Sequence, residues 1–334
     1  MLGDLAARVG RDIAPPPGAI HLIANPYSRV FRIEVDSGRN GLRVFLKMPR
    51  VRHDNRQRVA AALRNEFDAL TFLEGRFGPG TGLGVVSPLG LYSEYHALAT
   101  LEAPGASLRS ELASASAWLV GRQRGQRMRE LVRSCGRWLR QFHALTTQPS
   151  ASFDVGELAE YCGERLDTLA RRAASTSAGN AVAEIARRIE LHARRLRGAE
   201  CLMAGRHNDF AAHNIFVSDT GTTVLDFYMF DYGPIHYDVC SFWMDLEFMK
   251  FDPRYRSSFL STLQSDFLAA YDGLDGQEPL FELVKGRYLV NRMLNATGRG
   301  RSRSISGIGS RLEATACKRA LLRSLQGVSD GAPL

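Results

Sequence analysis

Residues whose side chains could take part in catalysis or metal binding are concentrated in two short segments. These are HNDFAAHNIFV (His207 to Val217) and LDFY, which begins at Leu225. Asp209, Asn214 and Asp226 supply two carboxylates and an amide beside apolar runs. Such oxygens suit Mg²⁺, which takes one or two protein carboxylates and leaves its other positions to phosphates and water. A carboxylate next to such an ion can orient a hydroxyl group toward a phosphate. These side chains are therefore candidates for phosphoryl-transfer chemistry.

The two segments are expected to form one antiparallel hairpin. NIFV and TVLDF are β-type runs, and SDTGT between them is a turn signal. A hairpin centred on Thr220 places Asn214 opposite Asp226, so we expect both to converge on a metal ion at its open end. Asp209 lies in the loop that enters the hairpin, where it is free to face a substrate hydroxyl.

Phosphoryl transfer also needs a lysine on the nucleotide phosphates. Lysine is rare here, at four of the 43 basic residues, and Lys47 ends the predicted strand VFLK. Glu66, in RNEFDAL on the helix that follows, is its predicted partner. An ion pair between them would fix an otherwise mobile amine.

The combination resembles the aminoglycoside phosphotransferase and choline kinase family, the small-molecule branch of the protein-kinase-like fold. Asp209 and Asn214 match the D-x-x-x-x-N spacing of its catalytic loop, LDFY matches its metal-binding aspartate, and VFLK matches its strand lysine. The resemblance implies ATP or GTP with Mg²⁺ as cofactors. It makes Asp209 the catalytic base, Asn214 and Asp226 the metal ligands, and Lys47 with Glu66 part of the nucleotide site.

The resemblance covers roughly residues 20–270. LEAPGASL resembles the hinge, whose backbone near Leu101 and Ala103 would bind adenine. The nucleotide-covering loop corresponds to NPYSRVF, which contains no glycine, and the amides of Ser28 and Arg29 are its candidate phosphate contacts.

Two further residues are expected to support the catalytic loop. His207 would bond backbone within the loop, and Asp238, in YGPIHYDVCSF, resembles an acid that braces it. The chain departs from the family pattern at Asn208, where H-G-D has glycine. It also has Tyr228 where protein kinases have the glycine of D-F-G, which argues against a switching activation segment.

The fold class expected is α+β and bilobal. Short β-type runs dominate residues 1–102, interrupted by helical periodicity over 54–76. Residues 1–102 are predicted to form a nucleotide-binding lobe with an antiparallel sheet and one helix. Residues 103–107 form the hinge, and 108–334 a larger, mostly helical lobe for catalysis and acceptor binding.

Composition narrows the cellular setting. The formal charge is +8, the chain has no apolar run long enough for a transmembrane segment, and its start lacks the pattern of a signal peptide. An odd, scattered set of cysteines argues against a disulfide framework or a zinc site and favours the cytoplasm. The cysteines are Cys135, Cys162, Cys201, Cys240 and Cys317.

The leading function is transfer of the γ-phosphate to a hydroxyl of a small molecule: an aminoglycoside, a sugar or an amino alcohol. The Arg-rich helical part fits a polycationic aminoglycoside poorly, so the acceptor, its regiochemistry and any role in antibiotic resistance stay open. Alternatives are a kinase of a glycan, a lipid-linked saccharide or a protein, and an inactive pseudokinase that serves as a nucleotide-binding scaffold. The glycine-free loop favours the scaffold, and the complete set of site residues disfavours it.

The basic stretch 298–303 allows several interpretations: a solvated loop, a contact for an anionic acceptor, or peripheral contact with an anionic surface. It is short and lacks interleaved aromatic residues, so no specific nucleic-acid partner is expected. Oligomeric state and the choice between ATP and GTP do not follow from the sequence.

Overall fold

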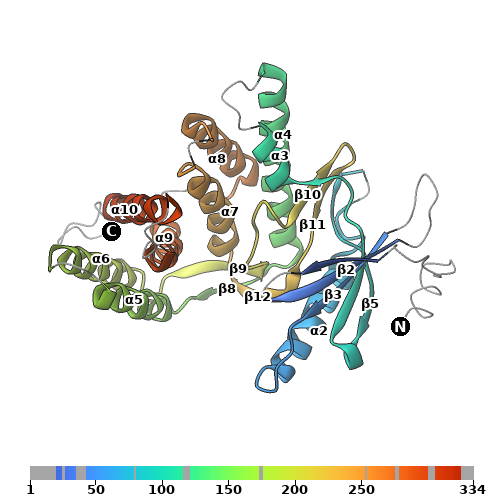
Figure 1. Cartoon of the computed structure of the whole chain (residues 1–334), viewed down its shortest axis with the longest axis horizontal. Coiled ribbons are helices and arrows are strands. Elements are labelled where there is room, and N and C mark those ends of the chain that lie inside the picture. Colours follow the sequence, from blue (N-terminus) through green and yellow to red (C-terminus); the bar gives the residue numbers. More distant parts are fainter. Residues whose placement is uncertain are drawn as a thin grey trace. The chain divides into compact units, whose positions relative to one another are not determined.

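The computed structural model describes residues 20–24, 27–34, 43–78, 80–115, 121–172, 176–252, 254–274, 278–299 and 305–324. The chain separates into two compact units (Figure 1). The strand-rich unit contains Met1–Ala115, Val120–Leu145 and Gly205–Asp231. The helical unit contains Ser116–Leu119, Thr146–Ala204 and Tyr232–Leu334. The expected lobe boundary at 103–107 stays a prediction.

An antiparallel sheet of the strand-rich unit has the order β1-β2-β3-β6-β5. On β3, alternate residues Val44 and Leu46 are buried in a cluster with Ile33. Because strand side chains alternate between faces, Lys47 belongs to the opposite face. The strands are β1 (Ile20–Ala24), β2 (Ser28–Glu34), β3 (Arg43–Pro49), β5 (Pro88–Tyr92) and β6 (Ala97–Leu101).

Helix α2 (Arg56–Leu73) follows β3 and confirms the predicted helix. Val59, Leu63, Leu70 and Leu73 recur at helical spacing and are buried. Glu66 is buried on the same helix, and a carboxylate in such a place requires a partner.

A second sheet has the order β4-β11-β10-β7 and carries the predicted hairpin. β7 (Ala106–Ser107) pairs with β10 in the stretch expected to be the hinge. Gly105 precedes it at φ 86°, where a Cβ would overlap the carbonyl oxygen of Val217. Glycine is therefore required for this close approach. The other strands are β4 (Leu83–Val85), β10 (Ile215–Ser218) and β11 (Gly221–Val224).

The register of the hairpin differs from the prediction by one residue. Ser218 pairs with Gly221 across a two-residue turn, and Asn214 faces Leu225, whose N–H donates to the Asn214 carbonyl at 3.1 Å. The expectation that Asn214 lies opposite Asp226 was wrong. Gly221 belongs to the strand rather than the turn. It lies so close to Gly82 that a Cβ would overlap the Gly82 carbonyl, which requires glycine here.

Helices α3 (Leu108–Ala115) and α4 (Arg122–Leu145) complete the strand-rich unit. Trp138 of α4 is fully buried and stacks on Phe77, Phe142 and Phe210. Its indole N–H donates to the Gly84 carbonyl at 2.7 Å, so the polar end of this ring is satisfied as well. Phe210 follows Asp209, so this aromatic stack anchors the loop that carries the expected catalytic base.

In the helical unit, α5 contacts α6 and α9, and α9 contacts α10 (Figure 1). β8 (Gln148–Ser152) pairs with β9 (Glu200–Arg206), strands that the sequence analysis did not assign, and β12 is Asp231–Pro234. The helices are α5 (Val155–Arg172), α6 (Thr176–Arg195), α7 (His236–Met249), α8 (Ser257–Tyr271), α9 (Pro279–Arg299) and α10 (Ile305–Ser324).

Other expectations concern single features. All five cysteines are free and buried. Within the described ranges, no helix is both long and apolar enough to cross a membrane. Of the basic stretch 298–303, residues 300–303 lie outside the described residues, and the others end α9.

Candidate active site

Lys47 of β3 joins two carboxylates that come from distant parts of the chain. Its Nζ donates to Oε2 and Oε1 of Glu66 at 3.0 and 3.2 Å, and to Oδ1 of Asp226 at 2.5 Å. Glu66 is only 2% exposed. The structure thus contains the pairing of Lys47 with Glu66 that the sequence predicted.

Burial and charge set the protonation of this cluster. Burial raises the pKa of Glu66 to about 7, although the charge of Lys47 opposes this shift. Burial acts to lower the pKa of Lys47, but attraction to Glu66 and Asp226 outweighs it and the pKa is raised. Burial acts to raise the pKa of Asp226, and Lys47 reverses the effect, so that this pKa is lowered. Lys47 and Asp226 are therefore charged at neutral pH, while Glu66 titrates close to it.

Asp226 has an unusual backbone conformation, with φ 70° and ψ 61°. This left-handed region is uncommon outside glycine, and aspartate and asparagine tolerate it best. Asp226 stands between β11 and the short helix η2 (Phe227–Met229). The kink takes Asp226 out of the strand register and lets its carboxylate reach Lys47.

His207 connects the residues just before and after the hairpin. Its ring is fully buried, its Nδ1 accepts the N–H of Asp209 at 3.3 Å, and its Nε2 lies 3.0 Å from the carbonyl oxygen of Leu225. Because Nδ1 accepts and a carbonyl can only accept, Nε2 carries the proton and the imidazole is neutral. The ring also packs 4.5 Å from that of Phe227. These contacts fit the supporting role predicted for His207.

Asn214 and Asp209 lie within hydrogen-bonding distance in the loop predicted to be catalytic. The Asn214 Nδ2 donates to the Asp209 carbonyl at 3.0 Å and to its Oδ2 at 2.9 Å. Both acceptors are oxygens, which fixes the amide orientation and leaves Oδ1 of Asn214 as its free ligand atom. His213 is exposed, and its Nε2 is 3.4 Å from Oδ2 of Asp209.

The donor set fits a hard divalent cation. Asn214 offers an amide oxygen, and Asp226 offers a carboxylate within a cluster of two acids and one lysine. The described residues contain no group of three or more His, Cys, Asp or Glu that could hold a metal. A cation here would therefore depend on oxygen ligands from phosphate and water, as Mg²⁺ commonly does.

Asn208 makes contacts that the sequence analysis did not foresee. It has φ 62°, which explains why asparagine can replace the family's glycine at this position. Its Nδ2 donates to the Met229 carbonyl and to Oδ1 of Asp231, both at 2.8 Å. Arg206 holds the same Asp231 by two hydrogen bonds of 2.7 Å. The loop that bears Asp209 is thereby tied to the segment that follows Asp226.

The same segment is also tied to α2. Asn65, the neighbour of Glu66, donates from Nδ2 to the carbonyl of Phe230. Residues 226–231 thus connect the helix that bears Glu66 with the loop that bears Asp209.

A pocket of the strand-rich unit contains Lys47, Glu66 and Asp226. Ser28, at the start of β2, lines it, whereas Arg29 is exposed and is not part of the lining. Most of the remaining lining is apolar, which suits a flat heterocycle. The apolar side chains are Val30, Phe45, Val86, Leu98, Leu101, Ala103, Phe216 and Leu225.

Backbone hydrogen bonds show which amides of the expected hinge already have a partner. The N–H of Leu101 donates to the Ser87 carbonyl and that of Glu102 to the Arg43 carbonyl, both at 2.9 Å. The N–H of Ala103 donates to no acceptor among the described residues. Ala103 is therefore the amide in this stretch that is available to a ligand.

Asp238 lies in the first turn of α7 in the helical unit and is completely buried. Its predicted role in bracing the catalytic loop stays a prediction.

Sequence comparison decides the family. The profile of the phosphotransferase enzyme family matches residues 20–276. The chain belongs to this family. No protein of curated function matches it.

Solved structures place this phosphotransferase-family chain in the protein-kinase-like fold, with an antiparallel-sheet N-terminal region and a helical C-terminal part. A thermostable mutant of aminoglycoside phosphotransferase APH(4)-Ia has 13% identity and a TM-score of 0.56, covering 99% of this chain and 100% of its own. A choline/ethanolamine kinase family protein from Mesorhizobium loti has 15% identity and a TM-score of 0.57, with coverage of 99% and 100%. A glucosamine kinase in complex with glucosamine, ADP and inorganic phosphate has 17% identity and a TM-score of 0.59, with coverage of 95% and 82%.

Proposed function

We propose that the protein is an ATP- and Mg²⁺-dependent phosphotransferase that moves the γ-phosphate to a hydroxyl of a small molecule. The observation that carries this proposal is the cluster of Lys47, Glu66 and Asp226 in one pocket. Solved relatives of the same fold are named as acting on, or bound to, glucosamine, amicoumacin and streptomycin, which supports a small hydroxylated acceptor.

The pocket supplies the nucleotide site in this proposal. Its apolar lining holds the base, and the N–H of Ala103 donates to an acceptor nitrogen of the ring. Lys47, held by Glu66, binds the phosphates, and the amides of Ser28 and Arg29, at the start of β2, are further candidate phosphate contacts, of which Ser28 lines the pocket. The lobe boundary at 103–107 belongs to the same proposal.

Oδ1 of Asn214 and the carboxylate of Asp226 would hold Mg²⁺. When bound, this ion neutralises charge on the phosphates and polarises them toward attack. Asp226 is suited to this role because Lys47 keeps its pKa low and it stays ionised.

Asp209 acts as the catalytic base. Its carboxylate orients the acceptor hydroxyl and takes its proton, while the acceptor oxygen forms a bond to the γ-phosphorus and the bond to the β-phosphate oxygen breaks. The Asn214 amide, 2.9 Å from Oδ2, fixes the carboxylate, and His207 holds the backbone of the same residue. Asp238 braces this loop in the proposal.

A substrate panel with an Asp209→Asn variant tests the function. ADP release is measured with ATP and Mg²⁺ against sugars, amino alcohols and aminoglycosides, and ATP binding is measured by calorimetry. We expect at least one acceptor to stimulate ADP release in the wild type, and the variant to lose turnover by about 10³-fold or more while it still binds ATP. Normal turnover in the variant contradicts the assignment of Asp209.

The same panel separates the other functions. Absence of both ATP binding and turnover would favour a scaffold, although the complete set of site residues argues against one. Turnover with a glycan, a lipid-linked saccharide or a protein instead would move the acceptor to that class.

The five free, buried thiols support a cytoplasmic location.

A further inference from the structure

Two arginines of the helical unit lie against one tyrosine ring. The guanidinium carbon of Arg165, on α5, is 3.3 Å from the ring centroid of Tyr161. That of Arg287, on α9, is 5.0 Å from the same centroid and 5.1 and 5.5 Å from the centroids of Tyr237 and Tyr288. Arg287 thus lies in an aromatic cage formed by Tyr161 of α5, Tyr237 of α7 and Tyr288 of α9.

Hydrogen bonds fix the walls of this cage. The hydroxyl of Tyr161 and the side-chain amide of Asn291 lie within hydrogen-bonding distance of each other. The hydroxyl of Tyr288 donates to the Tyr237 carbonyl at 3.3 Å, and Arg165 donates to the Tyr161 carbonyl at 3.2 Å. The rings are therefore ordered before any ligand arrives.

Among the described residues of this unit, three other cations face aromatic rings, and each pairs with an acid. Lys250, near Trp243, pairs with Glu247 at 2.6 Å, and Lys285 pairs with Glu282 at 2.6 Å. Arg292 of α9 lies 5.0 Å from the ring of Phe248 and pairs with Glu313. Arg165 and Arg287 form no ion pair with any acid among the described residues.

Neighbouring groups do not neutralise these charges. Burial raises the pKa of Cys162 to about 12 and that of Cys240 well above its usual value, although Arg287 acts to lower both. The pKa of Tyr288 is also raised, mainly by burial. These groups are neutral at physiological pH. Asp238 acts electrostatically on Tyr288 but forms no ion pair with Arg287.

A half-buried guanidinium without a carboxylate has lost part of its hydration and retains its binding capacity for an anion. Guanidinium groups bind carboxylates and phosphates by paired, charge-assisted hydrogen bonds. Arg292, on the same helix as Arg287, differs in this respect, because Glu313 of α10 neutralises its charge.

We propose that Arg287, supported by Arg165, forms an anion-binding subsite in the helical unit for a small molecule that carries a carboxylate or phosphate group. The aromatic rings around Arg287 would contact the apolar face of such a molecule.

Matched ligand pairs test the subsite by calorimetry. Glucuronate is compared with glucose, and glucose 6-phosphate with glucose, for protein saturated with a non-hydrolysable ATP analogue and Mg²⁺ so that the nucleotide site is filled. We expect an anionic member to bind at least about tenfold more tightly than glucose. Equal affinity of the anionic and neutral members overturns the proposal.

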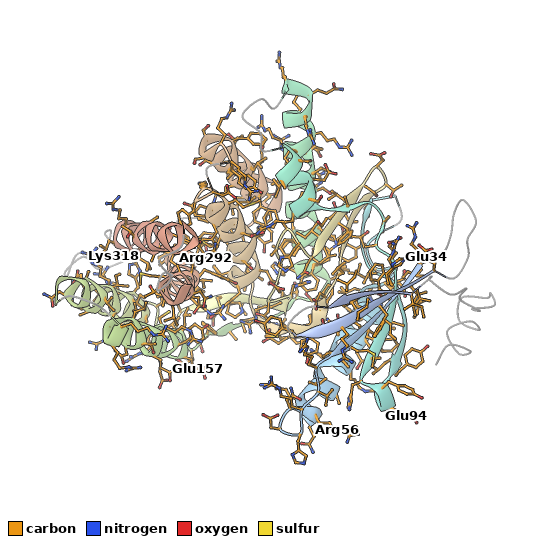
Figure 2. All side chains as sticks on the ribbon, viewed as in Figure 1. Glu34, Arg56, Glu94, Glu157, Arg292 and Lys318 are labelled. Carbon is orange, nitrogen blue, oxygen red and sulfur yellow. The ribbon has the colours of Figure 1, made fainter. Side chains whose placement is uncertain are left out.

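Variants assign the preference to the arginines. Arg287→Gln is expected to reduce the preference for the anionic compound about tenfold. Arg287→Lys should keep part of this preference, since lysine retains the charge without the planar guanidinium group. Arg165→Gln, on another helix, is expected to weaken it less. Arg292→Gln is the control on the same helix, whose side chain is labelled in Figure 2, and should leave the preference unchanged. A preference retained in Arg287→Gln, or lost equally in Arg292→Gln, refutes the assignment.

Turnover measured with the same compounds separates this proposal from the proposed function. If anionic compounds bind through Arg287 but no compound stimulates ADP release, the subsite stands and the kinase activity fails. If a compound stimulates ADP release but anionic and neutral compounds bind equally well to the wild type and to Arg287→Gln, the kinase activity stands and the subsite fails.

Discussion

The ammonium of Lys47 lies 2.5 Å from Oδ1 of Asp226, across 179 residues of sequence. Lys47 is the expected phosphate ligand and Asp226 the expected metal ligand. In the structure these two groups satisfy each other's charge. Under the proposed function, phosphate oxygens would contact the lysine and the cation would bind the carboxylate, so that each group would gain a second partner of opposite charge.

Removal of the Asp226 charge should uncouple nucleotide binding from the metal. In Asp226→Asn we expect ATP affinity measured with Mg²⁺ to fall by about tenfold or more, because a neutral amide replaces the ionised ligand. Calorimetric titration with and without Mg²⁺ measures the effect. Asp219→Asn is the control, since the Asp219 side chain is 95% exposed in the hairpin turn. An unchanged metal dependence in Asp226→Asn would refute the metal role.

Nucleotide binding should weaken at acidic pH through Glu66. Its pKa of about 7 means that the carboxylate is ionised above this pH and protonated below it. The carboxylate is therefore mostly ionised at pH 8 and mostly protonated at pH 6, and we expect KM for ATP to rise several-fold between these pH values. Glu66→Gln should have a high KM across this range and no such step. A step of equal size in that variant would assign the titration to another group.

The raised pKa of Glu66 should also make the stability of the fold depend on pH, in the opposite direction. The folded-state pKa of Glu66 lies above its ordinary value of 4.5, so the folded protein binds more protons than the unfolded chain between about pH 4.5 and 7. The contribution of this carboxyl group to the free energy of unfolding should therefore fall as pH rises through that window. Urea unfolding at pH 5 and 8 checks this, with Glu66→Gln expected to lack this component of the pH dependence.

Part of the site could be predicted from short-range patterns in the sequence. Lys47 ends an apolar strand and Glu66 stands on the following helix, and their separation in sequence is short enough for element prediction to bring them together. The hairpin was also predictable, because NIFV and TVLDF flank a turn signal.

The register of that hairpin was not predictable, because it depends on a contact with another strand. Gly221 belongs to β11 rather than to the turn, and Gly82, far away in sequence, packs against it. The left-handed backbone of Asp226 then moves its carboxylate out of register, which strand alternation cannot indicate. The bond from Asn208 to Asp231 also escaped prediction, since its partner is 23 residues away and begins β12, a strand that the sequence did not indicate.

Asn208 should position the catalytic loop rather than bind substrate. Asn208→Gly keeps the left-handed backbone accessible but removes the bonds to Met229 and Asp231, so we expect kcat to fall about three- to tenfold with KM for ATP nearly unchanged. Asn208→Ala should also be less stable by about 1 kcal/mol, because alanine disfavours φ near 62°. Steady-state kinetics and urea unfolding separate the two effects. If kcat of Asn208→Gly equals that of the wild type, the hydrogen bonds from Asn208 to Met229 and Asp231 have no role in catalysis.

Gly105→Ala should destabilise the protein more than its φ alone explains. The residue has φ 86°, and an added Cβ would also overlap the Val217 carbonyl, which belongs to a backbone that cannot move without breaking the pairing of β7 with β10. We expect a loss of more than about 2 kcal/mol in urea unfolding. Gly75→Ala is a matched control, because Gly75 has φ 75° with no atom within 4 Å of the new Cβ. It should lose only the cost of the left-handed backbone, about 1 kcal/mol. Equal losses in the two variants would show that the approach to Val217 does not require glycine.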